Sequence, residues 1–227
     1  MFLSSARAIL IGVGLCAAAP TLSETSAPTV QEIEAGELFP LVPGESTFEV
    51  VDGDGEGRQV VLELSSADGE GRWEVRFGDY NILHLFELRD GSVLLTGLDV
   101  LTQGQTVLYE PPVVLLPNKI VPDRTWSASG RATVVNRETQ EVVHKGQYQH
   151  RVLPITRERF ATRAGDYEGF LVPIEQTVDL EAQAVIRLWL DLGFFPGKGL
   201  VKRSMKFVVD KPLWFGSTTR RTADLVR

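Results

Sequence analysis

The sequence has few residues of the kinds that support metal, thiol or cofactor chemistry. It contains one cysteine, Cys16, and three histidines, His84, His144 and His150, among 227 residues. One cysteine cannot form an intramolecular disulfide or a cysteine-rich metal site. On one strand His144 and His150 would lie about 20 Å apart, at ~3.3 Å per residue, so they cannot share a zinc ion. We therefore expect core or cavity histidines, no metal and no cofactor.

The chain also lacks a long apolar run and an excess of basic residues. The uncharged apolar segment 9–19 is about eleven residues long, whereas about 20 are needed to cross a bilayer as a helix. The formal net charge is −7, with 30 acidic and 23 basic side chains. An acidic chain without a basic stripe disfavours nucleic acid as a partner. We expect no nucleic-acid partner and no transmembrane span in the mature chain.

The N-terminal segment 1–23 has the features of an export signal. A single basic residue, Arg7, precedes the apolar segment 9–19, and the whole segment contains no acidic residue. A short basic region followed by a short apolar region is typical of a signal peptide. We therefore predict an exported protein of the periplasm or cell envelope. Leu15 precedes Cys16, where a lipoprotein signal needs a small residue, so no lipid anchor is expected at Cys16.

The rest of the chain divides into a leader and one domain. Residues 24–37 are rich in Ser, Thr, Pro and Glu and predict a flexible leader with at most a short helix. Residues 38–227 alternate apolar and polar side chains with period two, as in 59–64 and 72–77, which predicts strands. No segment has a helical period longer than about two turns. We expect a single, mainly β domain of antiparallel strands.

Turn signals and prolines place the boundaries of these strands. Segment 52–57 predicts a hairpin because its glycines and acidic residues tolerate positive φ. With Glu63 it also resembles a calcium loop, but its flanks alternate with period two, whereas an EF-hand needs helices, so we expect a turn without metal. The prolines of 109–126 predict an extended connection rather than a central strand. Further strands are predicted at 126–136, 141–153, 170–180, 185–192, 200–209 and 215–226.

The candidate ligand-binding residues lie late in the chain, around Trp189. Trp189 shares a strand face with charged neighbours, while Leu188 and Leu190 take the opposite face. Two interpretations stay open. Trp189 either covers a sheet face shielded by a loop, or its face lines a groove for an apolar ligand, with aromatic help from Phe194 and Phe195.

The segment that follows, 196–199, predicts a tight turn. Gly197 and Gly199 reach positive φ without steric cost, so we expect them to reverse the chain between two strands. Lys198 at the tip is either solvated or placed to meet an acidic head group at the mouth of the groove. The segment is not a phosphate-binding loop, because the glycine spacing is wrong and no Ser or Thr follows Lys198.

No residue is predicted to be catalytic. Ser127 and Ser129 are not part of a Gly-x-Ser-x-Gly pattern, so a nucleophile elbow is absent. A Cys–His pair is excluded from the mature chain because Cys16 leaves with the signal peptide. Carboxylates are numerous, but no pattern selects a pair of them.

Segment 196–203, Pro-Gly-Lys-Gly-Leu-Val-Lys-Arg, resembles a signature of bacterial exported domains of unknown function in the TapB-like group. The likeness spans most of 38–203. Lys198 departs from the small apolar residue usual in that group, and Phe194-Phe195 replaces its Tyr-Ala. Three further pieces agree with the group in order: Phe39-Pro40-Leu41 with Gly44 and Phe48, the proline segment 115–126 that ends in Trp126, and the turn Ala164-Gly165-Asp166-Tyr167.

Such families are similar in fold to the lipoprotein-localisation factors LolA and LolB. The resemblance implies a curved antiparallel sheet that forms an open half-barrel, with an apolar concave face for lipid. We therefore expect a non-enzymatic binding domain with an apolar groove for a lipid-like ligand. The alternative is a structural or assembly protein that meets another envelope protein through its sheet face, and a hydrolase is the third candidate. Fold alone does not choose among them.

Overall fold

The computed structural model describes residues 32–67, 71–78, 82–181, 183–211 and 214–227. The predicted signal peptide, 1–23, and Cys16 lie outside these residues. The described elements are the helix α1 (Ala35–Leu38), the 3-10 turn η1 (Leu101–Gln103) and the strands β1 (Ile33–Glu34), β2 (Gly44–Gly53), β3 (Gln59–Ser66), β4 (Arg72–Phe77), β5 (Ile82–Arg89), β6 (Ser92–Val100), β7 (Gln105–Leu116), β8 (Lys119–Ile120), β9 (Trp126–Asn136), β10 (Val142–Val152), β11 (Thr156–Thr162), β12 (Gly165–Leu180), β13 (Ala184–Phe195), β14 (Gly199–Lys211) and β15 (Trp214–Leu225).

The main sheet is antiparallel and closes on itself. Its strand order is β10-β9-β7-β6-β5-β4-β3-β2-β15-β14-β13-β12-β11, and β10 also pairs with β12, which makes a closed barrel of 12 strands. The closing ladder joins 147–152 of β10 to 174–179 of β12. The prediction of a mainly β, antiparallel fold with at most short helices is confirmed. The predicted open half-barrel is wrong, because the last edge of the sheet is hydrogen-bonded and so removed.

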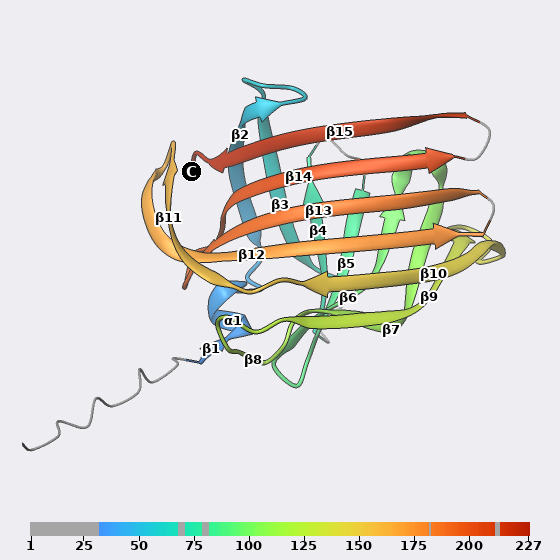
Figure 1. Cartoon of the computed structure of the whole chain (residues 1–227), viewed down its shortest axis with the longest axis horizontal. Helices are drawn as coiled ribbons and strands as arrows, with labels where there is room; N and C mark the ends of the chain where they lie inside the picture. The colour runs from blue at the N-terminus through green and yellow to red at the C-terminus, as the bar shows by residue number, and fades with distance from the viewer. Residues whose placement is uncertain (1–31, 68–70, 79–81, 182, 212–213) are drawn as a thin grey trace, which may run out of the picture.

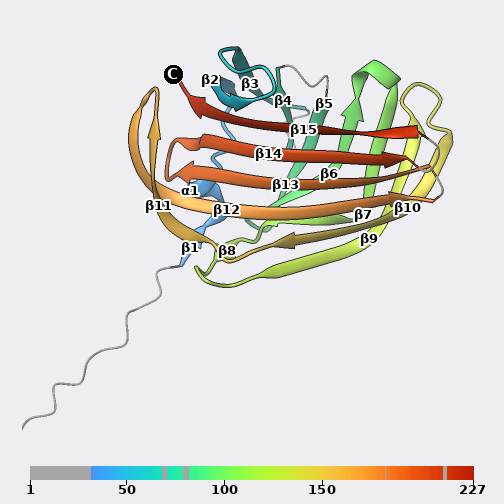
Figure 2. The same ribbon diagram turned by 45° about the horizontal axis from the view of Figure 1, so that its top comes forward.

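The barrel is flattened into two layers whose strands cross at a steep angle. In Figure 1, β12 to β15 run across the front, and β3 to β6 run from top to bottom behind them. The turned view of Figure 2 shows the same two layers joined through β7, β9 and β10 on one side. Most strands present alternate residues to the space between the layers, where the larger hydrophobic cluster lies.

A hairpin of β11 and β12 extends beyond this barrel. β10 ends at Val152, and the chain continues as β11, which pairs with the first part of β12 through residues 156–162. The hairpin curves upward at the left of Figure 1 toward the end of β15. At its tip the Ala164 N–H donates to the carbonyl of Leu225 at 2.9 Å. β11 was not among the predicted strands, because its sequence, Thr-Arg-Glu-Arg-Phe-Ala-Thr, has little apolar alternation.

The residues just before the barrel are part of the fold. β1 pairs with β8, and α1 follows it, with Ala35 and Leu38 fully buried. The N–H of Gly197 in the β13–β14 turn donates to the carbonyl of Glu37 at 2.9 Å. Residues 33–37, which the sequence assigned to the leader, therefore form β1 and most of α1, against one end of the barrel.

The proline segment differs from its prediction. Residues 105–116 form β7, a strand inside the sheet between β6 and β9, so the predicted connection at 109–126 is wrong over its first part. The pairing of β7 with β9 ends at Glu110, immediately before Pro111 and Pro112. Opposite these prolines, the register between β6 and β7 shifts. The strand thus accommodates two residues that cannot donate to a ladder at a place where the ladder is already interrupted.

Candidate functional site

An apolar cavity of about 110 Å³ lies inside the barrel. One wall comes from β3 to β7, and the other comes from β10 and from β12 to β14. Most of its lining is leucine and phenylalanine, so the cavity favours apolar groups. The described lining residues are Phe39, Leu62, Val75, Phe77, His84, Phe86, Leu95, Leu98, Leu115, His150, Ile174, Gln176, Leu188, Leu190, Leu192, Phe194, Leu200 and Arg203.

The inner face of β13 is not fully covered by the opposite wall. Leu188, Leu190 and Leu192 point into the cavity, and all three are only half-buried. The inward residues of the neighbouring β12, such as Ile174, are buried. Apolar surface without contacts on one side loses dispersion energy and hydrophobic stabilisation. The barrel therefore contains an apolar surface that a ligand could cover.

A polar cluster faces the cavity from β10 and β12. His150 and Gln176 are directly opposite each other in the closing ladder, and both are buried. The Gln176 amide donates to the Tyr109 hydroxyl at 3.1 Å. The ring of Tyr109 meets that of Tyr148 edge to face, and the Tyr148 hydroxyl donates to the carbonyl of Pro111 at 2.6 Å.

His150 is the polar side chain of this cluster that lacks hydrogen-bond partners. It is 2% exposed, and neither ring nitrogen has a hydrogen-bond partner among the described residues. Burial lowers the pKa of His150 to about 4, and the side chain of Gln176 opposes that shift as a polar neighbour, at a geometry that falls short of a formed hydrogen bond. The imidazole is therefore neutral at pH 7, with one donor and one acceptor unused. Such a group is rare in a folded protein and calls for an explanation.

A second histidine lies on the opposite wall of the cavity. His84 of β5 stacks on Phe86, with ring centroids 6.2 Å apart. Arg203 of β14 places its guanidinium 4.3 Å from the centre of the Phe77 ring. Burial, and then the positive charge of Arg203, lower the pKa of His84 to about 3. Both cavity histidines are thus neutral at pH 7.

The segment after α1 forms one side of the cavity. Phe39 lies between Phe86 of β5 and Phe194 of β13, at centroid distances of 5.8 Å and 5.7 Å. Its side chain is 8% exposed. This short N-terminal segment therefore joins the two layers of the barrel at the cavity.

The structure does not bring the predicted ligand-binding residues together. Phe194 lines the cavity. Trp189 lies on the outer face of β13, 36% exposed, with the ammonium of Lys206 4.9 Å from its ring centre. Phe195 and Lys198 lie away from the cavity, and both contact Tyr167. A ligand-binding role for Trp189, Phe194, Phe195 and Lys198 stays a prediction.

The predicted turn residues have the expected backbone. Gly197 and Gly199 have φ values of 77° and 88°, between β13 and β14. The hairpin at 52–57 likewise joins two strands, β2 and β3, and not two helices. The Asp54 carbonyl accepts from the Arg221 side chain at 2.6 Å, which ties this hairpin to β15.

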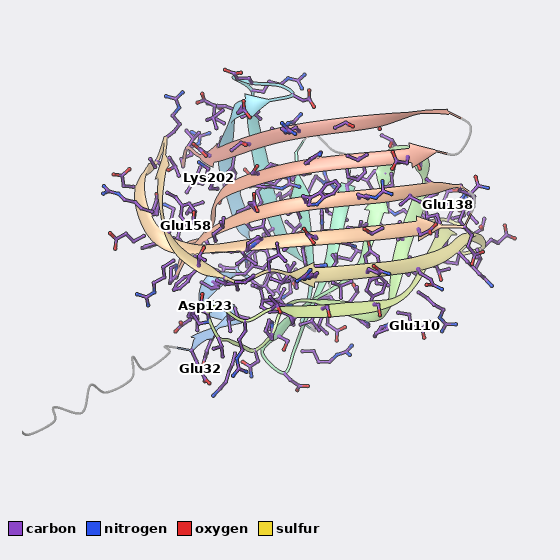
Figure 3. The ribbon with its side chains drawn as sticks, viewed as in Figure 1. Glu32, Glu110, Asp123, Glu138, Glu158 and Lys202 are labelled. Carbon is purple, nitrogen blue, oxygen red and sulfur yellow. The ribbon has the colours of Figure 1, made fainter. Side chains whose placement is uncertain are left out.

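Carboxylates do not reach the cavity. Among the described residues that line it, none is acidic. Figure 3 shows Glu110, Glu138 and Glu158 at the periphery of the barrel. Burial, and then the charge of Glu158, raise the pKa of Asp191, but Asp191 is on the exposed face of β13. The described lining residues of the cavity therefore include no carboxylate pair.

The described residues contain neither a cluster of metal-ligating side chains nor a membrane-spanning helix. Within them, no group of three or more His, Cys, Asp and Glu side chains could hold a metal ion. Over the same residues, no helix has the length and hydropathy that crossing a membrane requires.

Sequence reasoning identified the cavity only in part. It placed Leu188, Leu190 and Leu192 on one strand face and expected core or cavity histidines; the leucines, His84 and His150 line the cavity, whereas His144 does not. It missed the pairing of His150 with Gln176. These residues are 26 positions apart, and only closure of the barrel makes them neighbours.

Comparison with known proteins finds two solved structures with low sequence identity. No family model matches the chain, and no curated protein matches it. A crystal structure from Bacteroides fragilis, of a protein assigned as exported with a YmcC-like fold, is 13% identical, with a TM-score of 0.43; the match covers 84% of this chain and 97% of that one. A protein from Parabacteroides distasonis assigned as a lipoprotein is 10% identical, with a TM-score of 0.38, over 83% and 96%. The resemblance to the TapB-like group stays a prediction.

Proposed function

We propose that this domain is an exported binding protein that holds an apolar group inside its barrel. The observation that carries the proposal is the incompletely covered inner face of β13, where Leu188, Leu190 and Leu192 border a cavity of about 110 Å³. Protein interiors are otherwise close-packed, with few voids larger than a water molecule. The absence of acidic side chains from the described lining also favours binding over hydrolysis.

The size of the cavity limits what it can hold. Cavities that enclose drug-sized ligands measure roughly 300–1,000 Å³, and an engineered cavity of about 150 Å³ binds benzene. A cavity of about 110 Å³ therefore accepts a single small ring or the end of one acyl chain. A complete lipid would bind with one chain end inside the barrel and the rest outside.

A pair of variants on neighbouring residues tests where the ligand binds. Leu190→Trp fills the cavity from β13, whereas Trp189→Leu removes the exposed ring on the other face of the same strand. Benzene binding, measured by titration calorimetry, should fall at least about tenfold in Leu190→Trp, since about 1.4 kcal/mol of lost contacts gives that factor. It should be unchanged in Trp189→Leu. The opposite result would place the site on the outer face and refute the cavity proposal.

The natural ligand and export need separate measurements. Native mass spectrometry of protein purified from its own host should show an added mass that is lost in Leu190→Trp. N-terminal sequencing of the same material should find a start between about residues 19 and 24, after removal of the signal peptide. An intact Met1 in secreted protein would contradict the export proposal.

A further inference from the structure

We infer that the ligand is uncharged and carries a hydroxyl group, which His150 binds inside the barrel. This inference depends on the proposed cavity function and specifies its ligand. It starts from one observation, the buried imidazole of His150 without a partner. The position and charge state of His150 and the size of the cavity determine which group can pair with it.

The position of His150 directs its side chain to the ligand space. His150 is on β10, opposite Gln176 on β12 and Ala128 on β9. It lines the apolar cavity, and its neighbours in sequence, Gln149 and Arg151, are exposed on the outer face. Leaving a buried donor and acceptor unpaired is costly. A ligand that forms a hydrogen bond with His150 would therefore stabilise the barrel.

The charge state of His150 selects the kind of group. A neutral imidazole has one N–H donor and one nitrogen acceptor. A hydroxyl is complementary to either nitrogen, because its oxygen accepts and its O–H donates. An ionised carboxylate only accepts, and desolvating it at this apolar position is expensive. An ammonium only donates and meets the same penalty. An uncharged alcohol or phenol therefore suits His150 better than an ion.

The cavity also sets the size of the apolar part. A volume of about 110 Å³ is close to that required for a single ring. Phenol and benzene differ only by the hydroxyl, so their relative affinity isolates its contribution. Benzoate is ionised at pH 7 and serves as the anionic test ligand. Arg203 lines the same cavity and would attract it.

The experiment titrates the full mature protein with benzene, phenol and benzoate at pH 7 by calorimetry. Wild type should bind phenol roughly three- to tenfold more tightly than benzene, the factor that one net buried hydrogen bond provides. His150→Phe should reduce that ratio to about one while keeping benzene binding. His150→Gln, which has a donor and an acceptor, should restore part of the ratio. His144→Phe, the same change on the same strand outside the cavity, should leave it unchanged.

Each other outcome has a definite meaning. Equal binding of benzene and phenol by wild type, or a preference that survives in His150→Phe, overturns the hydroxyl inference and leaves the cavity function standing. Tightest binding of benzoate overturns it in favour of an anionic ligand near Arg203. Binding of none of the three refutes the cavity function, and the inference with it.

Discussion

At the scale of single residues, the two histidines that line the cavity, His84 and His150, make the barrel sensitive to acid. The pKa of His150 is lowered to about 4 and that of His84 to about 3, from an ordinary value of 6.5. Between these values and pH 6.5 the unfolded chain binds protons that the folded chain does not. Stability is therefore fully present above about pH 6.5 and is lost as the pH falls through this window.

We expect the free energy of unfolding to decrease by about 1–3 kcal/mol between pH 7 and pH 5.5, at up to ~1.4 kcal/mol per pH unit for each histidine. Urea denaturation at both pH values measures it. His150→Phe should remove a substantial part of the decrease. A wild-type stability that is flat over this range would show that the fold lowers the pKa of neither histidine.

The turn between β13 and β14 provides a second residue-scale prediction. Gly197 has a φ of 77°, which a β-branched residue adopts only with strain. Gly197→Val should destabilise the domain by about 1–3 kcal/mol, although an added Cβ would meet no atom within 4 Å. Lys198→Ala, at the exposed neighbour, should cost less than about 1 kcal/mol through its lost contact with Tyr167. Thermal melting compares the two, and equal melting temperatures would remove the turn argument.

At the scale of elements, the N-terminal segment acts as a wall of the cavity. β1 and α1 hold Phe39 between the two layers, where it contacts Phe86 and Phe194. The segment belongs to the barrel in packing, although its composition is that of a leader. Its removal would open the apolar interior to solvent at this end.

We expect Phe39→Ala to lower the free energy of unfolding by about 3 kcal/mol or more, the usual cost of a buried Phe-to-Ala change. The enlarged cavity should also accept a larger ring, so that naphthalene binds to the variant better than to wild type. Val42→Ala, three residues later at a side chain that is 65% exposed, is the control and should change neither property. Unchanged stability of Phe39→Ala would show that the packing of Phe39 does not stabilise the barrel.

At the scale of the whole molecule, barrel closure depends on the contact of β10 with β12. A Cβ added to Gly146 of β10 would lie 1.9 Å from the carbonyl oxygen of Asp179 in β12, so the two strands approach as closely as glycine allows. The same ladder continues to His150 and Gln176. The β10–β12 ladder that closes the barrel therefore also positions His150 and Gln176 at the proposed ligand site.

Gly146→Ala should force these strands apart, destabilise the whole domain and speed hydrogen exchange at the amides of 147–152. Hydrogen exchange followed by mass spectrometry, with urea denaturation, measures both effects. Gly36→Ala is the control, because a Cβ there meets nothing within 4 Å. Unaltered exchange along β10 in Gly146→Ala would mean that the closing ladder tolerates separation.

The sequence by itself determined the local features of this protein. Period-two alternation at 59–64 and 72–77 predicted β3 and β4, and the glycine-rich segment 52–57 predicted their neighbouring hairpin. Alternation also separated Trp189 from Leu188 and Leu190. Each of these features depends on residues that are close along the chain, where backbone sterics and side-chain periodicity act directly.

Only the tertiary structure decided that the sheet closes, which face of β13 points into the barrel, and that His150 lies opposite Gln176. β10 meets β12 across the hairpin extension of β11, a contact that no local pattern encodes, and this contact converts the expected open sheet into a barrel. The prolines of β7 predicted a connection instead of a strand, because a strand can place prolines where its ladder is already interrupted. His150 became a candidate ligand contact only when burial removed water from both its nitrogens, since hydrogen-bond satisfaction depends on every element that surrounds a residue.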